Sequence, residues 1–440
     1  MAHHMHQSNP PKNLAQWLSY IESLHPKSIA MGLDRVKQMI ERLKINPDFT
    51  IITVAGTNGK GSTCAMLEQA YINAGYQVGC YTSPHLLRYN ERVRVNKVEA
   101  SDDALCSAFL AVDAGRLDHS GDEISLTYFE VGTLAAMWHF IQTGVDVAIL
   151  EIGLGGRLDA VNAFEPNCAI VTSVDLDHQE FLGDTRESIG FEKAGVYRNA
   201  KPAICGDSNP PQRLLDYAQE IKADFKCINR DFEYTLLGVA YWQYSAGNVV
   251  YQLPLPALKG AYQLNNAACA VSAIEALQSK LPVKLEHIAN AMLKVSLAGR
   301  FQTVSNSPQI ILDVAHNPHA AKALAINLKA IRKPSGRTFA VFAMLADKDM
   351  HGVVEAVKEE IDVWYVAGID NVRGATANDL AAIVSAKNFK ATIKIFENAN
   401  IAYQQACIDV SENDKIIAFG SFYTVANVMQ SLLATQETNL

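Results

Sequence analysis

Residues 49–74 read FTIITVAGTNGKGSTCAMLEQAYINA, and this stretch determines the fold class. The run Phe49–Ala55 is apolar and rich in β-branched residues, which predicts a buried strand. A glycine-rich turn, 56–63, comes next, and the apolar spacing at 66–71 predicts a helix. This layout is typical of a phosphate-binding loop, because glycines let backbone N–H groups approach phosphates and a helix N-terminus attracts negative charge.

The loop departs from the usual phosphate-loop pattern G-x-x-x-x-G-K-[ST]. Counting back from Gly59, the first glycine of that pattern would fall on Val54. Gly61 follows Lys60, and the hydroxyl is delayed to Ser62. The layout still fits a phosphate site, with Lys60 as a mobile cation that reaches the terminal phosphates. An ordinary glycine-rich turn is the alternative, and we consider phosphate binding the better interpretation.

The composition is that of a globular protein. The chain has 440 residues, 49% hydrophobic and 19% charged, which is enough for two or three domains. A formal net charge of -8 argues against nucleic acid as the main partner, and no apolar run reaches the length of a membrane span. Residues 1–8 contain three histidines and resemble a tag remnant, so we exclude them from the site. Eight cysteines without C-x-x-C spacing predict reduced, buried thiols in a cytoplasmic protein.

Strand and helix patterns alternate along most of the chain. In the first part, strands are expected at 49–55, 77–82, 91–95, 145–150, 168–174 and 203–205, and helices at 14–24, 34–43, 101–114, 126–143, 189–196 and 262–277, with a hairpin at 234–253. In the second part, strands are expected at 310–314, 339–344, 363–366, 392–396 and 416–419, and helices at 318–331, 351–360, 377–386, 399–410 and 423–434.

This alternation predicts an α/β protein of two domains. The N-terminal domain, residues 1–297, should be a P-loop-type ATPase domain with a mostly parallel sheet. The C-terminal domain, residues 298–440, should be a smaller, Rossmann-like α/β domain. In such sheets, ligands bind beyond the carboxyl ends of the strands. A site is therefore expected at that edge.

Polar residues follow four predicted strands at that edge. The glycine-rich loop with Lys60 follows one strand, Ser83 and Glu151 follow two others, and the run 175–178 (DLDH) follows the fourth. A hydroxyl, a carboxylate and the imidazole of His178, placed beside a triphosphate, suit Mg²⁺. Each residue also has an ordinary alternative: a turn for Ser83, an ion pair for Glu151 and a loop or cap for His178. Their shared placement favours the metal.

Other candidates are weaker on sequence alone. The sequence around Lys193 indicates a solvated helix residue. Arg300 and Asp313 lie near the domain junction, where an arginine would clamp phosphate or form a surface ion pair. Asn317 precedes a proline, which indicates a helix cap. The residues thus predict a two-domain magnesium–nucleotide enzyme, and kinase, hydrolase and ligase activities remain open.

At these residues the chain resembles a known family, the bacterial folylpolyglutamate synthase/dihydrofolate synthases, which are Mur-ligase-like ATP-dependent amide ligases. The matching segments follow the family's order and cover nearly the whole chain after about residue 14: VAGTNGKGST (54–63), TSPHL (82–86), ERVRV (91–95), LTYFE (126–130), EIGLGGRLDAVN (151–162), DLDH (175–178), ESIGFEKAGV (187–196), AGRFQ (298–302), DVAHNPHAA (313–321), MLADKD (344–349), RGAT (373–376) and GSFYTVA (420–426). The GTNGKGS form of the loop is the family's own, which accounts for the unmatched pattern.

The resemblance implies an ATP and magnesium site. The residues it assigns to ATP are Asn58, Gly59, Lys60, Gly61, Ser62, Asn266, Arg300 and Asp313. It assigns Ser83, Glu151 and His178 to magnesium, with two Mg²⁺ ions and an optional monovalent cation as cofactors. Lys193 aligns with a lysine that the family carbamylates, which requires a neutral amine. Lys60, Lys193, His178 and His316 are then the catalytic candidates.

The resemblance also implies a two-step reaction. A pterin carboxylate attacks the γ-phosphate of ATP to give an acyl phosphate, and the amine of L-glutamate then displaces phosphate. His316 and Ser421 are the candidates for handling glutamate, on the C-terminal glutamate-ligase domain. The acceptors would be dihydropteroate and tetrahydrofolate, with neither nucleic acid nor a membrane as partner. We expect a monomer, since nothing in the sequence marks an interface.

The pterin pocket contains one departure from the family pattern. The resemblance places it at Ala30, Met31 and Gly32, at Thr127, Tyr128, Phe129 and Glu130, and at Leu158, Asp159 and Ala160. Members that make dihydrofolate often carry an acid where this chain has Ala30, and alanine cannot bond the pterin edge. Asp34, which lies nearby in the sequence, would supply the missing carboxylate in place of residue 30, although a helix cap is its more ordinary role. The overall match favours both activities over a folylpolyglutamate synthase alone.

Two other interpretations compete with this one. A muramyl-peptide ligase shares the loop and the fold, but the segments SPHL and LTYFE argue against it. The second competing interpretation is a nucleotide-binding regulator without ligase chemistry. The retained metal and linker positions argue against such a regulator.

Overall fold

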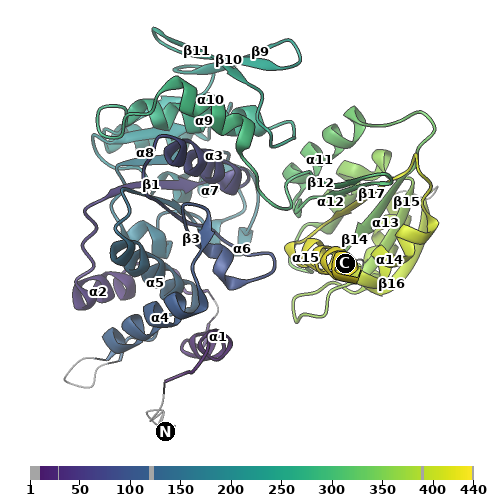
Figure 1. Ribbon diagram of the computed structural model, residues 1–440, viewed down its shortest axis with the longest axis horizontal. Coiled ribbons are helices and arrows are strands. Elements are labelled where there is room, and N and C mark those ends of the chain that lie inside the picture. The colour runs from purple at the N-terminus through teal and green to yellow at the C-terminus, as the bar shows by residue number, and fades with distance from the viewer. Residues whose placement is uncertain (1–9, 28, 118–122, 388–390, 439–440) are drawn as a thin grey trace.

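The protein consists of two α/β domains that follow one another along the chain (Figure 1). The computed structural model describes residues 10–27, 29–117, 123–387 and 391–438. Residues 1–8, where the sequence suggests a tag remnant, lie outside this part. The first domain contains an eight-stranded sheet and a small three-stranded one, and the second contains a six-stranded sheet. The expected α/β architecture is confirmed.

The strand predicted from residues 49–55 lies at the centre of the large sheet. This strand, β1 (Thr50–Ala55), pairs in parallel with β5 (Val147–Glu151) and β6 (Cys168–Val171). The sheet continues through β2 (Val78–Tyr81), β3 (Val93–Val95) and β4 (Val98–Glu99) on one side, and through β7 (Pro202–Cys205) and β8 (Asp224–Cys227) on the other. Only β3 and β4 pair antiparallel, so the carboxyl ends of the other strands meet at one edge.

Both faces of this sheet are covered by helices, which is why β1 is a continuous apolar run. All six of its residues are buried, and Ile51 and Ile52 point into two different cores. One core involves α1 (Leu14–Ser23), α2 (Asp34–Leu43), α4 (Asp102–Arg116), α5 (Tyr128–Thr143), α7 (Arg186–Ala194) and α8 (Gln212–Glu220). The other involves α3 (Lys60–Asn73), α9 (Gln263–Ala276) and α10 (Leu285–Lys294).

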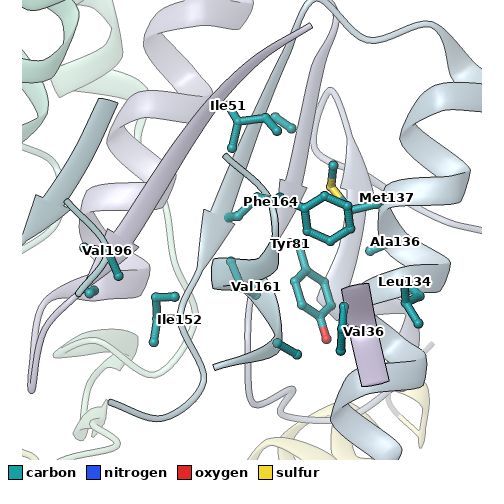
Figure 2. Close-up of a cluster of buried hydrophobic side chains, with 14 of the residues drawn as sticks. Val36, Ile51, Tyr81, Leu134, Ala136, Met137, Ile152, Val161, Phe164 and Val196 are labelled. Carbon is teal, nitrogen blue, oxygen red and sulfur yellow. The ribbon is translucent and has the colours of Figure 1, made fainter. Parts of the chain in front are cut away.

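Figure 2 shows part of the first core, where Tyr81 and Ile51 from the sheet gather with Leu134 and Met137 from α5. These four side chains are at most 4% exposed. Dense apolar packing of this kind makes the sheet a rigid platform for the loops at its edge.

The predicted hairpin at 234–253 is wrong by one strand. The structure has three antiparallel strands, β9 (Glu233–Leu237), β10 (Tyr241–Ala246) and β11 (Val249–Pro254). The expected turn at Gly247 does join β10 to β11. The first turn, at Gly238, carries a weaker sequence signal, since Val239 and Ala240 follow it. Trp242 on β10 is fully buried and joins this small sheet to the second core.

The second domain is built around a parallel sheet with one antiparallel edge strand. Its order is β12 (Gln302–Asn306), β13 (Gln309–Leu312), β17 (Lys415–Phe419), β14 (Thr338–Phe342), β15 (Val363–Gly368) and β16 (Thr392–Asn398). Only β12 is antiparallel. The helices α11 (Pro318–Ala330), α12 (Met350–Val357) and α13 (Ala377–Lys387) cover one face, and α14 (Ala399–Asp409) and α15 (Phe422–Thr438) cover the other.

Sequence reasoning missed two amphipathic helices and two strands. These are α8, α10, β8 and β12, of which β8 is the polar edge strand DFKC. The predicted strand at 91–95 is confirmed at Val93–Val95, which form β3, and is wrong at its first two residues, which belong to a short 3-10 helix, η1 (Tyr89–Arg92). Three further short helices are η2 (Ala160–Ala163), α6 (Gln179–Leu182) and η3 (Lys358–Glu360).

The cysteines are free thiols, as the sequence predicts, and six of the eight are buried. Cys106 is partly buried and Cys407 is exposed, so burial was overestimated for these two. Among the described helices, none is both long and apolar enough to cross a membrane.

Candidate active site

A cavity of about 330 Å³ lies between the two domains, at the carboxyl edge of the large sheet. Its walls combine the glycine-rich loop, the ends of β2, β5, β6 and β7, and the start of the second domain. The residues expected for ATP and magnesium gather here, although they are up to 255 positions apart, from Asn58 to Asp313. Parallel strands explain this, since successive strand ends meet at one edge.

The glycine-rich loop has the backbone of an anion cradle. Gly56 and Gly59 have φ of +145° and +87°, a region that other residues rarely adopt. A Cβ on Gly59 would lie 2.3 Å from Asn266 Oδ1, and one on Gly56 would lie 1.9 Å from Thr172 Oγ1. The helix α3 begins at Lys60, so free backbone N–H groups face the cavity.

Lys60 folds back over this loop. Its Nζ donates to Gly56 O at 3.0 Å and to Thr57 O at 3.3 Å. These carbonyls hold the ammonium at the mouth of the cradle, where a terminal phosphate would meet it. Ser62, two residues further along α3, is buried and accepts a hydrogen bond from Gln263 Nε2 at 3.4 Å.

The three residues expected for magnesium lie around the same cavity. Glu151 is 5% exposed, and its Oε2 accepts the backbone N–H of Ser83 at 3.0 Å. Burial raises the pKa of Glu151, while Lys60 and the Ser83 N–H oppose that shift. His178 is the N-cap residue of the short helix α6 and has φ of +52°, and burial lowers the pKa of its imidazole to about 4. A neutral imidazole and a buried carboxylate are suited to a cation.

No group of three or more His, Cys, Asp or Glu side chains is arranged as a metal site in the part of the chain that is described. The donors present are one hydroxyl, one carboxylate and one imidazole. Such a sparse set fits magnesium, which keeps waters and takes phosphate oxygens from its nucleotide. It does not fit a metal held by protein ligands alone.

Lys193 differs from the solvated helix residue that its sequence suggests. It is 4% exposed and lines the cavity together with Lys60 and Glu151. Burial, reinforced by the charge of Lys60, lowers the pKa of Lys193 to about 7. The amine is therefore partly neutral near neutral pH, which is the form that reacts with CO₂.

The second domain contributes Arg300, Asp313 and His316 to the cavity. The Asp313 carboxylate accepts the N–H groups of Phe301 and Ala315, both at 2.8 Å, and so shapes the linker. Arg300 lies with its guanidinium carbon 5.2 Å from the centre of the Phe422 ring. Of the two alternatives for Arg300, the position of both residues in the cavity lining favours a phosphate contact over a surface ion pair, and that contact stays a prediction.

His316 and Ser421 differ in their placement. His316 lines the cavity, its Nδ1 lies 2.8 Å from Val314 O, and its Nε2 lies 3.9 Å from Asp177 Oδ2 of the first domain. Ser421 is 3% exposed, and its Oγ accepts the N–H of Thr424 at 3.0 Å at the start of α15. The structure gives Ser421 the contacts of a helix cap, and its role in glutamate binding stays a prediction.

The residues expected for the pterin come together beside this cavity rather than within its lining. Gly32 N donates to Leu158 O at 3.1 Å, which joins two of the three segments. Arg35 joins the third, because its Nη2 lies 2.8 Å from Glu130 Oε1 and donates to Ala30 O at 2.7 Å. The predicted loop, helix start and 158–160 segment are thus physically connected.

Several of these pterin candidates also have structural contacts. Thr127 and Glu130 form the capping box of α5. Asp159 caps η2 and accepts the N–H groups of Leu154 and Val161 at 2.8 and 3.0 Å. Asp34 is the first residue of α2 and its side chain does not cap that helix, so the expected capping role is wrong.

Two contacts between the domains were not predicted. Tyr262 and His319 stack with their ring centres 5.0 Å apart, and both line the cavity at the end near the loop 206–208. Asn58 of the glycine-rich loop exchanges two hydrogen bonds with Asn317, at 3.1 and 3.2 Å. Asn317 does cap its helix, as expected, by accepting the N–H of Ala320. The sequence predicts a turn at Asn58 and the first residues of two helices at Tyr262 and His319, but it does not show these contacts, because the partners lie more than 50 positions apart.

Two family models match the chain. The Mur ligase middle domain matches residues 54–274, and the Mur ligase glutamate ligase domain matches residues 299–422. The dihydrofolate synthase/folylpolyglutamate synthase of Escherichia coli (strain K12) is 44% identical over 418 residues, 95% of each chain. The chain belongs to the dihydrofolate synthase/folylpolyglutamate synthase family of Mur ligases.

Solved structures of family members agree with this fold over nearly their whole length. The Escherichia coli FolC in complex with DHPP and ADP superposes with a TM-score of 0.91 at 44% identity, covering 97% of this chain and 99% of that one. A bifunctional folylpolyglutamate synthase/dihydrofolate synthase with Mn, AMPPNP and L-glutamate bound has a TM-score of 0.88 at 43% identity, covering 97% and 100%.

Proposed function

We propose that this member of the family joins L-glutamate to dihydropteroate, forming dihydrofolate, and to tetrahydrofolate, extending its glutamate tail. The observation that carries the proposal is the interdomain cavity, in which an anion cradle, a sparse magnesium-type donor set and a buried lysine face residues of the second domain. Relatives with that fold are solved with a nucleotide, with DHPP and with L-glutamate.

In the first step, the pterin carboxylate attacks the γ-phosphorus of ATP, and the bond to the β–γ bridging oxygen breaks to release ADP. The backbone N–H groups at Gly59–Gly61 and the ammonium of Lys60 would stabilise charge on the transferred phosphoryl group. Asn266 and Arg300 would orient the nucleotide, and the Tyr262–His319 stack offers an aromatic surface for the base.

Ser83, Glu151 and His178 would hold magnesium together with phosphate oxygens and water. When bound, the ion supplies positive charge against the phosphates. Two ions, and a monovalent cation, are proposals that rest on the resemblance. Lys193 is proposed to be carbamylated, which would convert a buried ammonium into an anion facing Lys60.

In the second step, the amine of L-glutamate attacks the acyl carbon, phosphate leaves and the amine loses a proton. His316 is the proposed contact for glutamate, since it lines the cavity from the second domain. Closure of the two domains would keep water from the acyl phosphate, which otherwise hydrolyses. The chain is proposed to act as a monomer.

The departure at Ala30 affects only the pterin contact. The Ala30 carbonyl is held by Arg35, so the loop is fixed by its backbone rather than by an acidic side chain. We propose that this fixed loop still accepts dihydropteroate.

ADP release tests the proposal, with Mg²⁺, ATP, L-glutamate and one acceptor at a time. We expect turnover with dihydropteroate and with tetrahydrofolate, each dependent on glutamate. Turnover with tetrahydrofolate alone would restrict the function to folylpolyglutamate synthesis and would locate the lost activity at Ala30. No glutamate-dependent turnover with either acceptor would refute the proposed reaction.

A further inference from the structure

Two segments of the second domain, MLADKD (344–349) and RGAT (373–376), have no part in the site described so far. In the structure they pack against each other. Ala346 N donates to Arg373 O at 2.8 Å, and Ala375 N donates to Met344 O at 3.0 Å. The Arg373 guanidinium also lies 2.6 Å from Asp347 Oδ2. The second segment therefore braces the first, which carries Lys348.

Lys348 reaches across to the first domain. Its Nζ lies 2.7 Å from Asp177 Oδ1 and 3.3 Å from His178 Nε2. The side chains of Lys348 and Asp177 are only 9% and 11% exposed. An ion pair so well shielded from water depends strongly on geometry, because each charge has lost most of its hydration.

Asp177 receives a second contact from the same domain. Asn317 Nδ2 donates to Asp177 Oδ2 at 3.2 Å, and Asn317 also pairs with Asn58 in the glycine-rich loop. All hydrogen-bonding positions of the Asn317 amide are thereby used, since its Oδ1 accepts from Ala320 N and from Asn58. Asp177 thus receives one cation and one amide from the second domain, and the imidazole nitrogens His316 Nε2 and His178 Nε2 each lie 3.9 Å from its oxygens.

We propose that Asp177, Lys348 and Asn317 form an interdomain latch that holds the second domain closed over the glycine-rich loop, with Lys348 as a positioning residue. The inference rests on the proposed ATP site between the domains, to which the latch is adjacent. When the domains part, both charges regain water, so the latch favours one orientation without making closure irreversible. Removing one charge leaves the other unpaired in the closed form, which disfavours closure. Removing both charges lifts that penalty.

A measurement of the distance between the two domains tests the latch directly and does not depend on enzyme activity. Spin labels would be placed at Cys407, which is exposed on α14, and at Val98→Cys, a position that is 71% exposed on β4. Cys106→Ser would remove the partly buried thiol. Pulsed electron–electron double resonance on the full chain without nucleotide then measures the distance distribution between the two labels. The populations of the closed and open forms follow from that distribution.

We expect Lys348→Met and Asp177→Asn each to raise the open-to-closed ratio by about tenfold or more. The double variant should fall back toward the wild-type ratio. Lys329→Met, an exposed lysine on α11, is the matched control and should change nothing. Circular dichroism would check that each variant is folded.

Equal distance distributions for Lys348→Met and wild type would overturn the latch. So would a double variant whose effect is the sum of the two single effects. A change in the KM for glutamate or ATP with an unchanged distribution would instead make Lys348 a ligand contact, and would also overturn it. Loss of turnover in the wild-type chain would refute the proposed reaction while leaving the distance measurement valid, so the two failures are distinguishable.

Discussion

Replacing Gly59 by alanine is expected to weaken ATP binding. Gly59 has φ of +87°, and for a residue with a side chain this region costs about 1–2 kcal/mol. The new Cβ would also lie 2.3 Å from Asn266 Oδ1, which is 4% exposed and has little room to move. Turning Asn266 away would break its hydrogen bond to Gln263 Oε1, at 3.1 Å, and cost about 1 kcal/mol more.

The total of about 2–3 kcal/mol can appear in either of two measured quantities. If the loop moves, the Kd for nucleotide rises by about 30- to 150-fold. If the loop keeps its shape, the free energy of unfolding falls by the same amount. Isothermal titration calorimetry with AMPPNP and Mg²⁺ measures the first quantity, and urea denaturation measures the second. We expect most of this free energy to appear as weaker nucleotide binding, because the loop lines the cavity and can move there without disturbing the core.

Gly75→Ala is the matched control. Gly75 has φ of +92°, and no heavy atom lies within 4 Å of the position that a Cβ would take there. It ends the turn after α3, so its substitution carries similar backbone strain without a clash. Only the free energy of unfolding should fall. If Gly59→Ala binds nucleotide and unfolds like the wild type, the proposed close fit between loop and Asn266 is wrong.

Three further outcomes are expected. Intact-mass measurement of the native chain should show a CO₂ increment on Lys193 whose occupancy increases as the pH rises from 6 to 8. With a pKa of about 7, the neutral fraction of the Lys193 amine rises over this range from about one tenth to about nine tenths. Lys193→Arg should lack the increment and lose activity. Arg35→Met should raise the KM for dihydropteroate about tenfold and leave the KM for ATP unchanged, since the buried Glu130 loses its cation. Ser421→Ala should lower the free energy of unfolding by about 1 kcal/mol through its lost bond to Thr424 and leave the KM for glutamate unchanged.

Each of these three predictions can be contradicted by a specific result. An unmodified Lys193 at every pH, in buffer with bicarbonate, would count against carbamylation. Arg88→Met is the control for Arg35, because the Arg88–Glu99 pair is exposed and 3.7 Å long; equal effects of the two would show that Arg35 does not fix the pterin loop. A raised KM for glutamate in Ser421→Ala would return Ser421 to the glutamate site.

Local patterns in the sequence were sufficient for the fold class and for the family. The run 49–63 predicted strand, cradle and helix, because glycine content and apolar spacing act over a few residues. The same reasoning placed Lys60, Glu151 and His178 at one edge, since parallel strands bring their carboxyl ends together. Where the pattern was weak, as in the polar strand β8 or the turn at Gly238, it failed.

Burial and partners between distant residues were decided by the tertiary structure alone. The local sequence indicates a solvated Lys193, yet packing buries it and lowers its pKa. The resemblance makes Ser421 a candidate for glutamate binding, yet the structure encloses this side chain, which accepts the N–H of Thr424 at the start of α15. The pairing of Asp177 with Lys348 joins residues 171 positions apart. Such contacts depend on how two domains meet, and the spacing of residues along one segment carries no record of the surface that will lie opposite it.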